Sequence, residues 1–128
     1  MKISPVIFGV AIAALSKIAA AATWWIFASG PTGSIAYDKG TINRNGSHVL
    51  VWRRDSFTTP QNIDGSHTYN EQRYRIDLDC ARGTAEFLEG GSYLNGTRVL
   101  GQTLPDVRLI DNIHPDEVNA WLEKQVCN

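Results

Sequence analysis

Hydrophobic and polar residues alternate along the stretch from position 73 to position 80. The apolar positions are Tyr74, Ile76, Leu78 and Cys80, and the polar positions are Arg73, Arg75, Asp77 and Asp79. A period of two is typical of a β-strand with one buried and one solvent-facing side. The pattern therefore predicts the longest strand of the chain over residues 68–80, with Cys80 on its buried face.

Further strands are predicted on both sides of this one. They cover residues 24–27, 34–37, 41–44, 47–57, 84–94 and 97–102, and residues 107–110 are either a last short strand or a connection. Within 47–57 the run from Val49 to Trp52 is continuously apolar, which predicts a strand covered on both faces. Asn45-Gly46 and Asn95-Gly96 separate extended runs and predict tight hairpin turns. Residues 58–65, which include Pro60 and Gly65, are expected to form a loop.

One helix is predicted near the end of the sequence. Val118, Trp121, Leu122 and Val126 are spaced as one apolar helical stripe. Asn112 or His114 is the expected N-cap, followed by Pro115 in the first turn. Cys127 lies off the stripe, so the helix should end before it and let the thiol reach the sheet. The predicted fold is α+β, mainly β, with an antiparallel multi-stranded sheet and a C-terminal helix.

The first 22 residues have the features of a secretory signal peptide. Lys2 precedes an apolar stretch that ends in a run of alanines from Ala19 to Ala22. Lys17 interrupts that stretch too early for a membrane-spanning helix, which is the alternative interpretation. We therefore expect a signal peptide at 1–22, one domain at 23–128 and no membrane span after cleavage. We expect the mature protein to be exported and to be periplasmic, on the cell surface or secreted.

The charge balance limits the classes of partner. The chain has 12 basic and 13 acidic residues, a formal net charge of −1, and loss of Lys2 and Lys17 with the signal peptide changes it to −3. Binding to a phosphate backbone needs a basic excess, so a dedicated nucleic-acid binder is not expected.

Cys80 and Cys127 are the two cysteines of the sequence. Disulfides persist outside the cytoplasm, so export predicts a structural bridge between them. Closing a loop of this length contributes about 4 kcal/mol in the chain-entropy description. A redox-active thiol is the alternative, but the sequence has no C-x-x-C motif to support it.

The ionisable residues predict neither a catalytic site nor a cofactor or metal site. His48, His67 and His114 do not have the spacing of metal ligands. Asp77 and Asp79 share one face of the long strand, which would suit a hydrolase, but arginines on the same face favour salt bridges instead. We therefore expect a protein that is not an enzyme, binds no cofactor and functions through its surface.

Aromatic residues are frequent in the predicted domain. Trp52 and Trp121 are assigned to packing between sheet and helix, while other tryptophans and tyrosines are expected on the uncovered face. Exposed aromatic residues beside arginine are typical of binding surfaces. The ligand-binding residues themselves are unknown from the sequence.

The order of several short motifs resembles one small exported family. They are Tyr37-Asp38, Val49-Leu50-Val51-Trp52, Cys80, Tyr93, Ile113-His114-Pro115 and the penultimate Cys127. Together they resemble the surface-adhesin protein E-like domain of Gram-negative bacteria, over residues 24–127. The resemblance implies a sheet with a disulfide-tethered C-terminal helix, binding of host matrix proteins, and a homodimer as one form of the protein. An adhesin is the first hypothesis. The second is a periplasmic or secreted inhibitor that binds a partner enzyme through residues 58–65.

Overall fold

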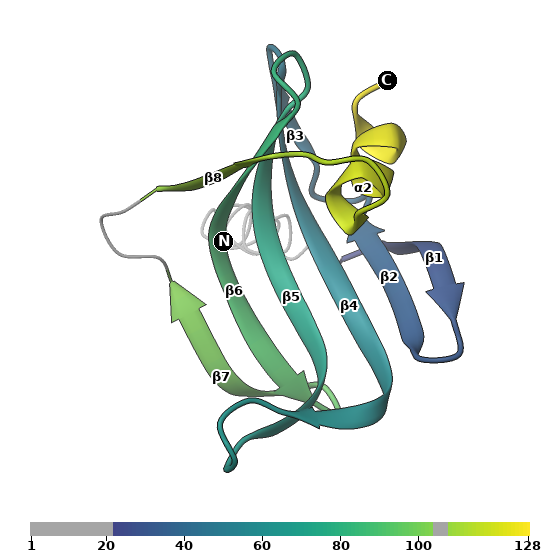
Figure 1. The fold of residues 1–128 in the computed structure, drawn as a ribbon, viewed down its shortest axis with the longest axis vertical. Helices are drawn as coiled ribbons and strands as arrows, with labels where there is room; N and C mark the ends of the chain where they lie inside the picture. Colours follow the sequence, from purple (N-terminus) through teal and green to yellow (C-terminus); the bar gives the residue numbers. More distant parts are fainter. Residues whose placement is uncertain (1–21, 104–107) are drawn as a thin grey trace, which may run out of the picture.

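The structure, a computed structural model, describes residues 22–103 and 108–128. This part of the chain folds into one antiparallel sheet and a C-terminal helix (Figure 1). The elements are β1 (Trp24–Gly30), β2 (Gly33–Asp38), β3 (Asn43–Asn45), β4 (His48–Asn62), β5 (Thr68–Asp79), β6 (Thr84–Leu94), β7 (Thr97–Thr103), β8 (Leu109–Asn112) and α2 (Val118–Val126). The predicted fold class is confirmed.

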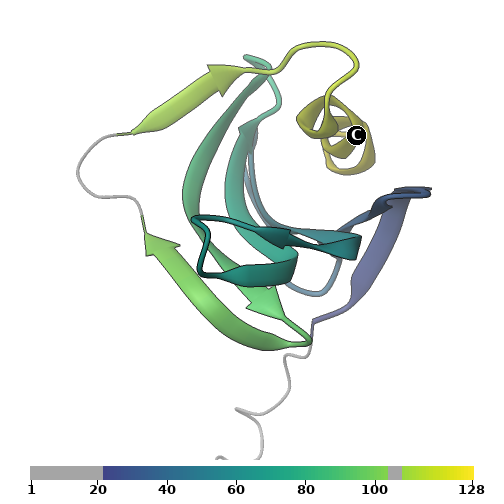
Figure 2. The ribbon, with the colours of Figure 1, turned by 60° about the horizontal axis from the view of Figure 1, so that its bottom comes forward.

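The strands follow one another across the sheet almost in sequence order. The path is β1-β2-β4-β5-β6-β7, with β3 paired to one end of β4 and β8 paired to one end of β6. The sheet curves strongly, and α2 lies inside the curve (Figure 2). We call the side that carries α2 the inner face and the opposite side the outer face.

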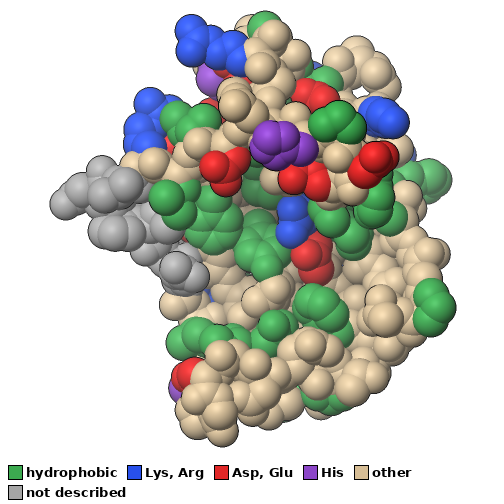
Figure 3. Space-filling view, viewed as in Figure 1, with side chains coloured by type: hydrophobic (Ala, Val, Ile, Leu, Met, Phe, Trp, Pro, Cys, Tyr) green, Lys and Arg blue, Asp and Glu red, His purple; other side chains and the backbone are tan. Residues whose placement is uncertain are grey.

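The hydrophobic core lies between α2 and the inner face. Val49, Val51, Ile76 and Leu78 of the central strands pack with Leu122 and Val126 of the helix, and all six are at most 4% exposed. Hydrophobic side chains gather around the helix and across this face (Figure 3). The core residues that the structure describes, and the disulfide, lie within residues 27–127.

The central strand β4 is covered less completely than its apolar run predicted. Val49 and Val51 are buried, whereas Leu50 and Trp52 alternate with them and remain partly exposed. The prediction that this strand is covered on both faces is wrong, because α2 covers only the inner side. Trp52 is likewise not a core residue: it lies on the outer face opposite Arg75 of β5.

The predicted loop at residues 58–65 is largely strand. β4 continues to Asn62 and, after an irregularity, pairs again with β5 through Gln61–Tyr69 and Asn62–Thr68. The turn is thereby reduced to the tip of a long hairpin, and β4 rather than β5 is the longest strand. The two Asn-Gly turns are confirmed: Asn95 has φ 50°, and Gly46 and Gly96 have φ 62° and 85°.

The helix is shorter at its start than predicted. It begins after Glu117, which is the N-cap residue but makes no side-chain capping bond. Instead, the Glu117 carboxylate accepts a hydrogen bond from the backbone N–H of His114, so neither predicted cap residue has that role. Trp121 is 40% exposed, which makes its assignment to the core wrong.

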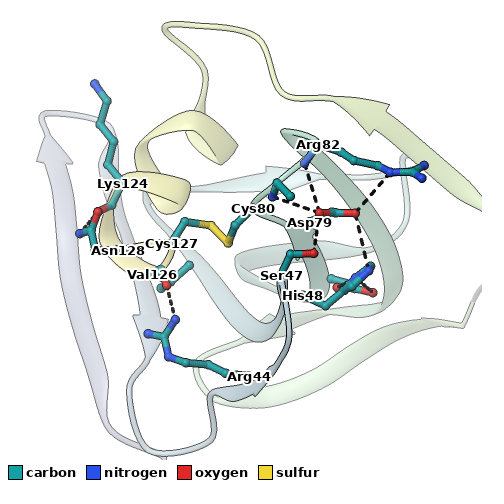
Figure 4. The surroundings of a disulfide bond; sticks show 12 residues. Arg44, Ser47, His48, Asp79, Cys80, Arg82, Lys124, Val126, Cys127 and Asn128 are labelled. Atoms are coloured by element: carbon teal, nitrogen blue, oxygen red, sulfur yellow. Dashed lines mark hydrogen bonds and ion pairs between the residues drawn. A yellow bond between two sulfur atoms is a disulfide. The ribbon is translucent and has the colours of Figure 1, made fainter.

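A disulfide joins the end of α2 to the end of β5 (Figure 4). The helix ends at Val126 as predicted, and Cys127 forms the bridge to Cys80 with a Cα–Cα distance of 5.6 Å. The Arg44 guanidinium donates to the carbonyl of Val126, which ties the same helix end to β3. The C-terminal helix is therefore fixed to the sheet covalently as well as by packing.

The predicted signal peptide lies almost wholly outside the described residues, so its cleavage stays a prediction. Within residues 22–103 and 108–128, the structure contains no helix with the length and apolar character needed to cross a membrane.

Candidate binding surface

The outer face carries arginine and aromatic side chains from four strands. Arg54 of β4 lies directly opposite Arg73 of β5 in the strand register. Trp24 reaches this pair from β1, and Tyr93 reaches it from β6. We call Trp24, Arg54, Arg73 and Tyr93 the arginine–aromatic ladder.

The ladder is held together by stacking of guanidinium groups on aromatic rings. The Cζ atom of Arg54 lies 4.7 Å from the centre of the Trp24 ring. The Cζ atom of Arg73 lies 4.2 Å from the Tyr93 ring and 5.9 Å from the Trp24 ring. Each cation–π contact of this kind contributes about 0.5–1 kcal/mol at an exposed site. These contacts order long side chains before any partner arrives.

Small residues make room for the arginines. Ala36 of β2 lies opposite Arg54, and Gly91 of β6 lies opposite Arg73. Beyond Gly91, a Cβ atom at Gly101 would lie only 1.9 Å from a terminal nitrogen of Arg98. Arg98 therefore lies flat across glycine backbone and adds a third guanidinium group beside the ladder.

The charges of the ladder are not balanced evenly. Arg73 is paired with Glu71, and the neighbouring Arg75 lies 3.5 Å from Glu89. For Arg54 the described residues show no carboxylate partner, and its Nε is a buried side-chain nitrogen without a hydrogen-bond partner. Two like charges directly opposite each other on a sheet destabilise it. The Arg54–Arg73 pair is thus a local excess of positive charge.

The position of Trp24 depends on a buried carboxylate. Asp38, 3% exposed, pairs with Trp24 in the register and accepts hydrogen bonds from the backbone N–H of Thr23 at 2.7 Å, from Gly40 at 2.9 Å and from the Thr41 hydroxyl at 2.7 Å. Burial by itself would raise the pKa of Asp38, but these hydrogen bonds outweigh it and lower the pKa. Asp38 therefore stays ionised and fixes the start of β1.

Comparison with protein families found a match. The sequence model of the family described as surface-adhesin protein E matches residues 24–128. The chain belongs to the surface-adhesin protein E family. The resemblance seen in the sequence is confirmed, and family membership makes this an adhesin-like, exported or cell-surface protein. Comparisons with curated proteins and with solved structures found no match.

The two aspartates considered for catalysis in this adhesin-family chain are held in local contacts, and Figure 4 shows those of Asp79. Asp77 accepts from His48 at 3.0 Å, while Asp79 accepts from the Ser47 hydroxyl at 3.1 Å and lies 3.9 Å from Arg82. The prediction that these aspartates form salt bridges with the arginines of their own strand is therefore wrong. Within the described ranges, no group of three or more His, Cys, Asp or Glu side chains could hold a metal ion.

A further arginine–aromatic contact lies on the inner face and has a structural role. Arg53 stacks on Tyr74 at 4.7 Å, pairs with Asp55 at 2.8 Å and donates to Asn119 of α2 at 3.0 Å. Burial, followed by the nearby Asp55 charge, raises the pKa of Tyr74 to about 12. Because Arg53 is fully paired and bonded to the helix, it joins the two layers rather than leaving charge for a ligand.

The tip of the β4–β5 hairpin is exposed but well ordered by hydrogen bonds. The Asp64 carboxylate accepts from the backbone N–H of Ser66 at 3.0 Å and of His67 at 2.8 Å, and from both of their side chains. These hydrogen bonds lower the pKa of Asp64. Ile63, 40% exposed, stands at this tip. The hairpin tip is thus a second surface that the adhesin-family chain presents to solvent.

Proposed function

We propose that this chain is an exported, non-enzymatic module that binds other proteins, and that it contacts host matrix proteins as an adhesin. In this proposal residues 1–22 are removed on export and residues 23–128 are the working domain. The observation that carries it is the arginine–aromatic ladder, which lies on the sheet face opposite α2. No described helix or strand covers this face (Figure 2).

The chemistry of the ladder suits binding between proteins. Tryptophan, tyrosine and arginine are the residues most enriched where interfaces derive their affinity. Association costs less when such side chains are already ordered, because less rotamer freedom is lost on binding. The cation–π contacts of Arg54 and Arg73 provide that order in the free protein.

The test is a pull-down with the exported protein, purified from bacteria that express the full chain. It is immobilised and offered purified matrix proteins in one arm and a periplasmic extract in the other. Retention of a matrix protein, lost in Trp24→Ala, is the expected result. The matched control is Trp121→Ala, since this tryptophan is exposed on α2 at the inner side. If every matrix protein passes through unbound, or if the Trp24 and Trp121 variants behave alike, the proposal fails.

A second candidate function is a periplasmic or secreted inhibitor that inserts the hairpin tip into a partner enzyme. The exposed Ile63 beside the hydrogen-bonded Asp64 turn favours it, because a rigid, projecting tip loses little freedom on binding. In the same pull-down, capture of an envelope enzyme that Ile63→Ser abolishes and Trp24→Ala leaves intact would support the inhibitor over the adhesin.

A further inference from the structure

We infer that the arginine–aromatic ladder binds an acidic segment of a protein, with a side-chain carboxylate seated between Arg54 and Arg73. This assignment rests on the proposed protein-binding function and names the chemistry of the partner. It starts from the direct opposition of the two arginines across β4 and β5. Neighbouring strands are about 4.8 Å apart, so a single carboxylate group can lie between the two guanidinium groups.

The free donors of the two arginines are suited to a carboxylate. Arg73 uses its Nε for Glu71, which leaves its terminal nitrogens for another acceptor. The described ion pairs include none for Arg54, so its terminal nitrogens are held by no carboxylate of the described chain, while its Nε is buried without a hydrogen-bond partner. Planar guanidinium groups bind carboxylates through paired, charge-assisted hydrogen bonds. A bound carboxylate would also offset the repulsion between the opposed arginines.

The surroundings favour an acidic protein segment over a long polyanion. Nucleic acids and sulfated polysaccharides bind along extended basic surfaces, whereas the whole chain carries a formal charge of −1. Glu71 and Glu89 flank the ladder and would repel a continuous line of phosphates or sulfates. Each carboxylate of a protein segment is separated from the next by neutral backbone, so one can enter while its neighbours avoid these glutamates.

The aromatic rings are not placed as stacking platforms for bases or sugars. Arg73 covers a face of Tyr93 at 4.2 Å, and Arg54 covers a face of Trp24 at 4.7 Å. Single-stranded nucleic acids gain much of their affinity by stacking on such faces. Here the rings orient the guanidinium groups, whose edges are left to donate hydrogen bonds.

The experiment measures binding of a fluorescent octapeptide of alternating glutamate and serine to the exported protein by anisotropy. The same peptide with glutamine for glutamate is the charge control. We expect the glutamate peptide to bind and the glutamine peptide to bind at least about tenfold more weakly. Arg54→Gln and Arg73→Gln should each weaken the glutamate complex by about tenfold or more. Arg82→Gln is the matched control, since this arginine has an 82% exposed side chain away from the ladder and should leave the affinity unchanged.

Three results would overturn the inference. One is equal affinity of wild type and Arg54→Gln for the glutamate peptide, and another is the absence of any binding by the wild type. The third is tighter binding of a heparin oligosaccharide than of the peptide, with heparin binding lost in the same arginine variants. That result would assign the site to a polyanion. Circular dichroism and urea unfolding of each variant confirm that the fold is intact before binding is compared.

The outcome is distinguishable from that of the proposed function. If the pull-down captures a matrix protein and the capture survives both arginine substitutions, the protein-binding function stands and the acidic-segment assignment fails. If the peptide binds as expected and no matrix protein is captured, the ladder has its assigned chemistry in a protein that is not a matrix adhesin.

Discussion

At the scale of single residues, Asp38 shows how one carboxylate positions a surface side chain. Its three hydrogen bonds join Thr23, Gly40 and Thr41 and thereby fix the strand start that carries Trp24. Tyr37-Asp38 is one of the motifs that resemble the family, but the sequence alone predicts no role for Asp38. The reason is that Gly40 and Thr41 are close to Asp38 in the sequence, whereas Thr23 is 15 residues away and is brought to the carboxylate only by the pairing of β1 with β2.

Asp38→Asn should destabilise the fold by about 1–3 kcal/mol at pH 7, because the amide cannot satisfy three donors as a carboxylate does. The pKa of Asp38 is lowered on folding, so its contribution is complete above the ordinary value of 3.8 and is lost as the pH falls through the lower folded value. The difference between variant and wild type in urea unfolding should therefore shrink below pH 3.8. Asp111→Asn, on an exposed position of β8, is the control. A difference that persists unchanged at low pH would contradict the role given to the charge.

The same carboxylate makes the cleavage site testable. If cleavage follows Ala22, the Thr23 nitrogen that lies 2.7 Å from Asp38 becomes an α-ammonium, and a neutral hydrogen bond becomes a charge-assisted one. A protein that begins at Thr23 should then unfold about 4–8 °C higher than one that begins at Ala22, which corresponds to about 1 kcal/mol. The advantage should disappear at a pH high enough to deprotonate the ammonium. Equal melting temperatures of the two forms at pH 7 would show that the fold does not use the new terminus.

At the scale of elements, the sequence predicts correctly those features that depend on residues close together in the chain. The two Asn-Gly turns, the period-two strand before Cys80 and the helix end before Cys127 were all predicted and are all present. The surroundings of β4 were not predictable in this way, because the coverage of a strand depends on which face α2 occupies. Its extension past Pro60 depends on renewed pairing with β5.

The apolar stripe of α2 separates into a core part and an exposed part, and this difference can be measured. Leu122 is fully buried, whereas Trp121 is 40% exposed at the rim of an inner-face hollow of about 410 Å³. Leu122→Ala should cost about 2–5 kcal/mol of unfolding free energy. Trp121→Ala should cost less than about 1 kcal/mol. Urea unfolding of both variants checks this, and a larger loss for Trp121→Ala would mean that the tryptophan closes over the core in solution.

At the scale of the whole molecule, the candidate site is a product of strand order. The sequence pointed to aromatic residues and arginines on an uncovered face but could not select Trp24, Arg54, Arg73 and Tyr93 among them. These residues come from positions up to 69 apart in the sequence, between Trp24 and Tyr93. Their contact requires that β1, β2, β4, β5 and β6 lie side by side in one register. Hydrophobic periodicity fixes which face a residue occupies, but not which residues on that face meet.

Strand order also leaves β1 at an edge of the sheet in the described part of the chain, and this predicts self-association. The strand has no charged side chain of its own, and its Trp25 and Ile26 are 51% and 53% exposed, although the Lys39 ammonium lies 4.2 Å from the centre of the Trp25 ring. An uncharged, exposed edge is a template for pairing with a second copy unless a charge or a bulge blocks it. The irregularity between Ile26 and Ala28 confines regular pairing to the first half of the strand.

We expect light scattering to show that the wild-type protein is a dimer at micromolar concentration. Ile26→Lys should be a monomer, because it places a charge on the edge. Ile63→Lys, at the hairpin tip, is the control and should remain a dimer. A wild-type protein that stays monomeric at about a hundred micromolar would show that the bulge alone protects this edge.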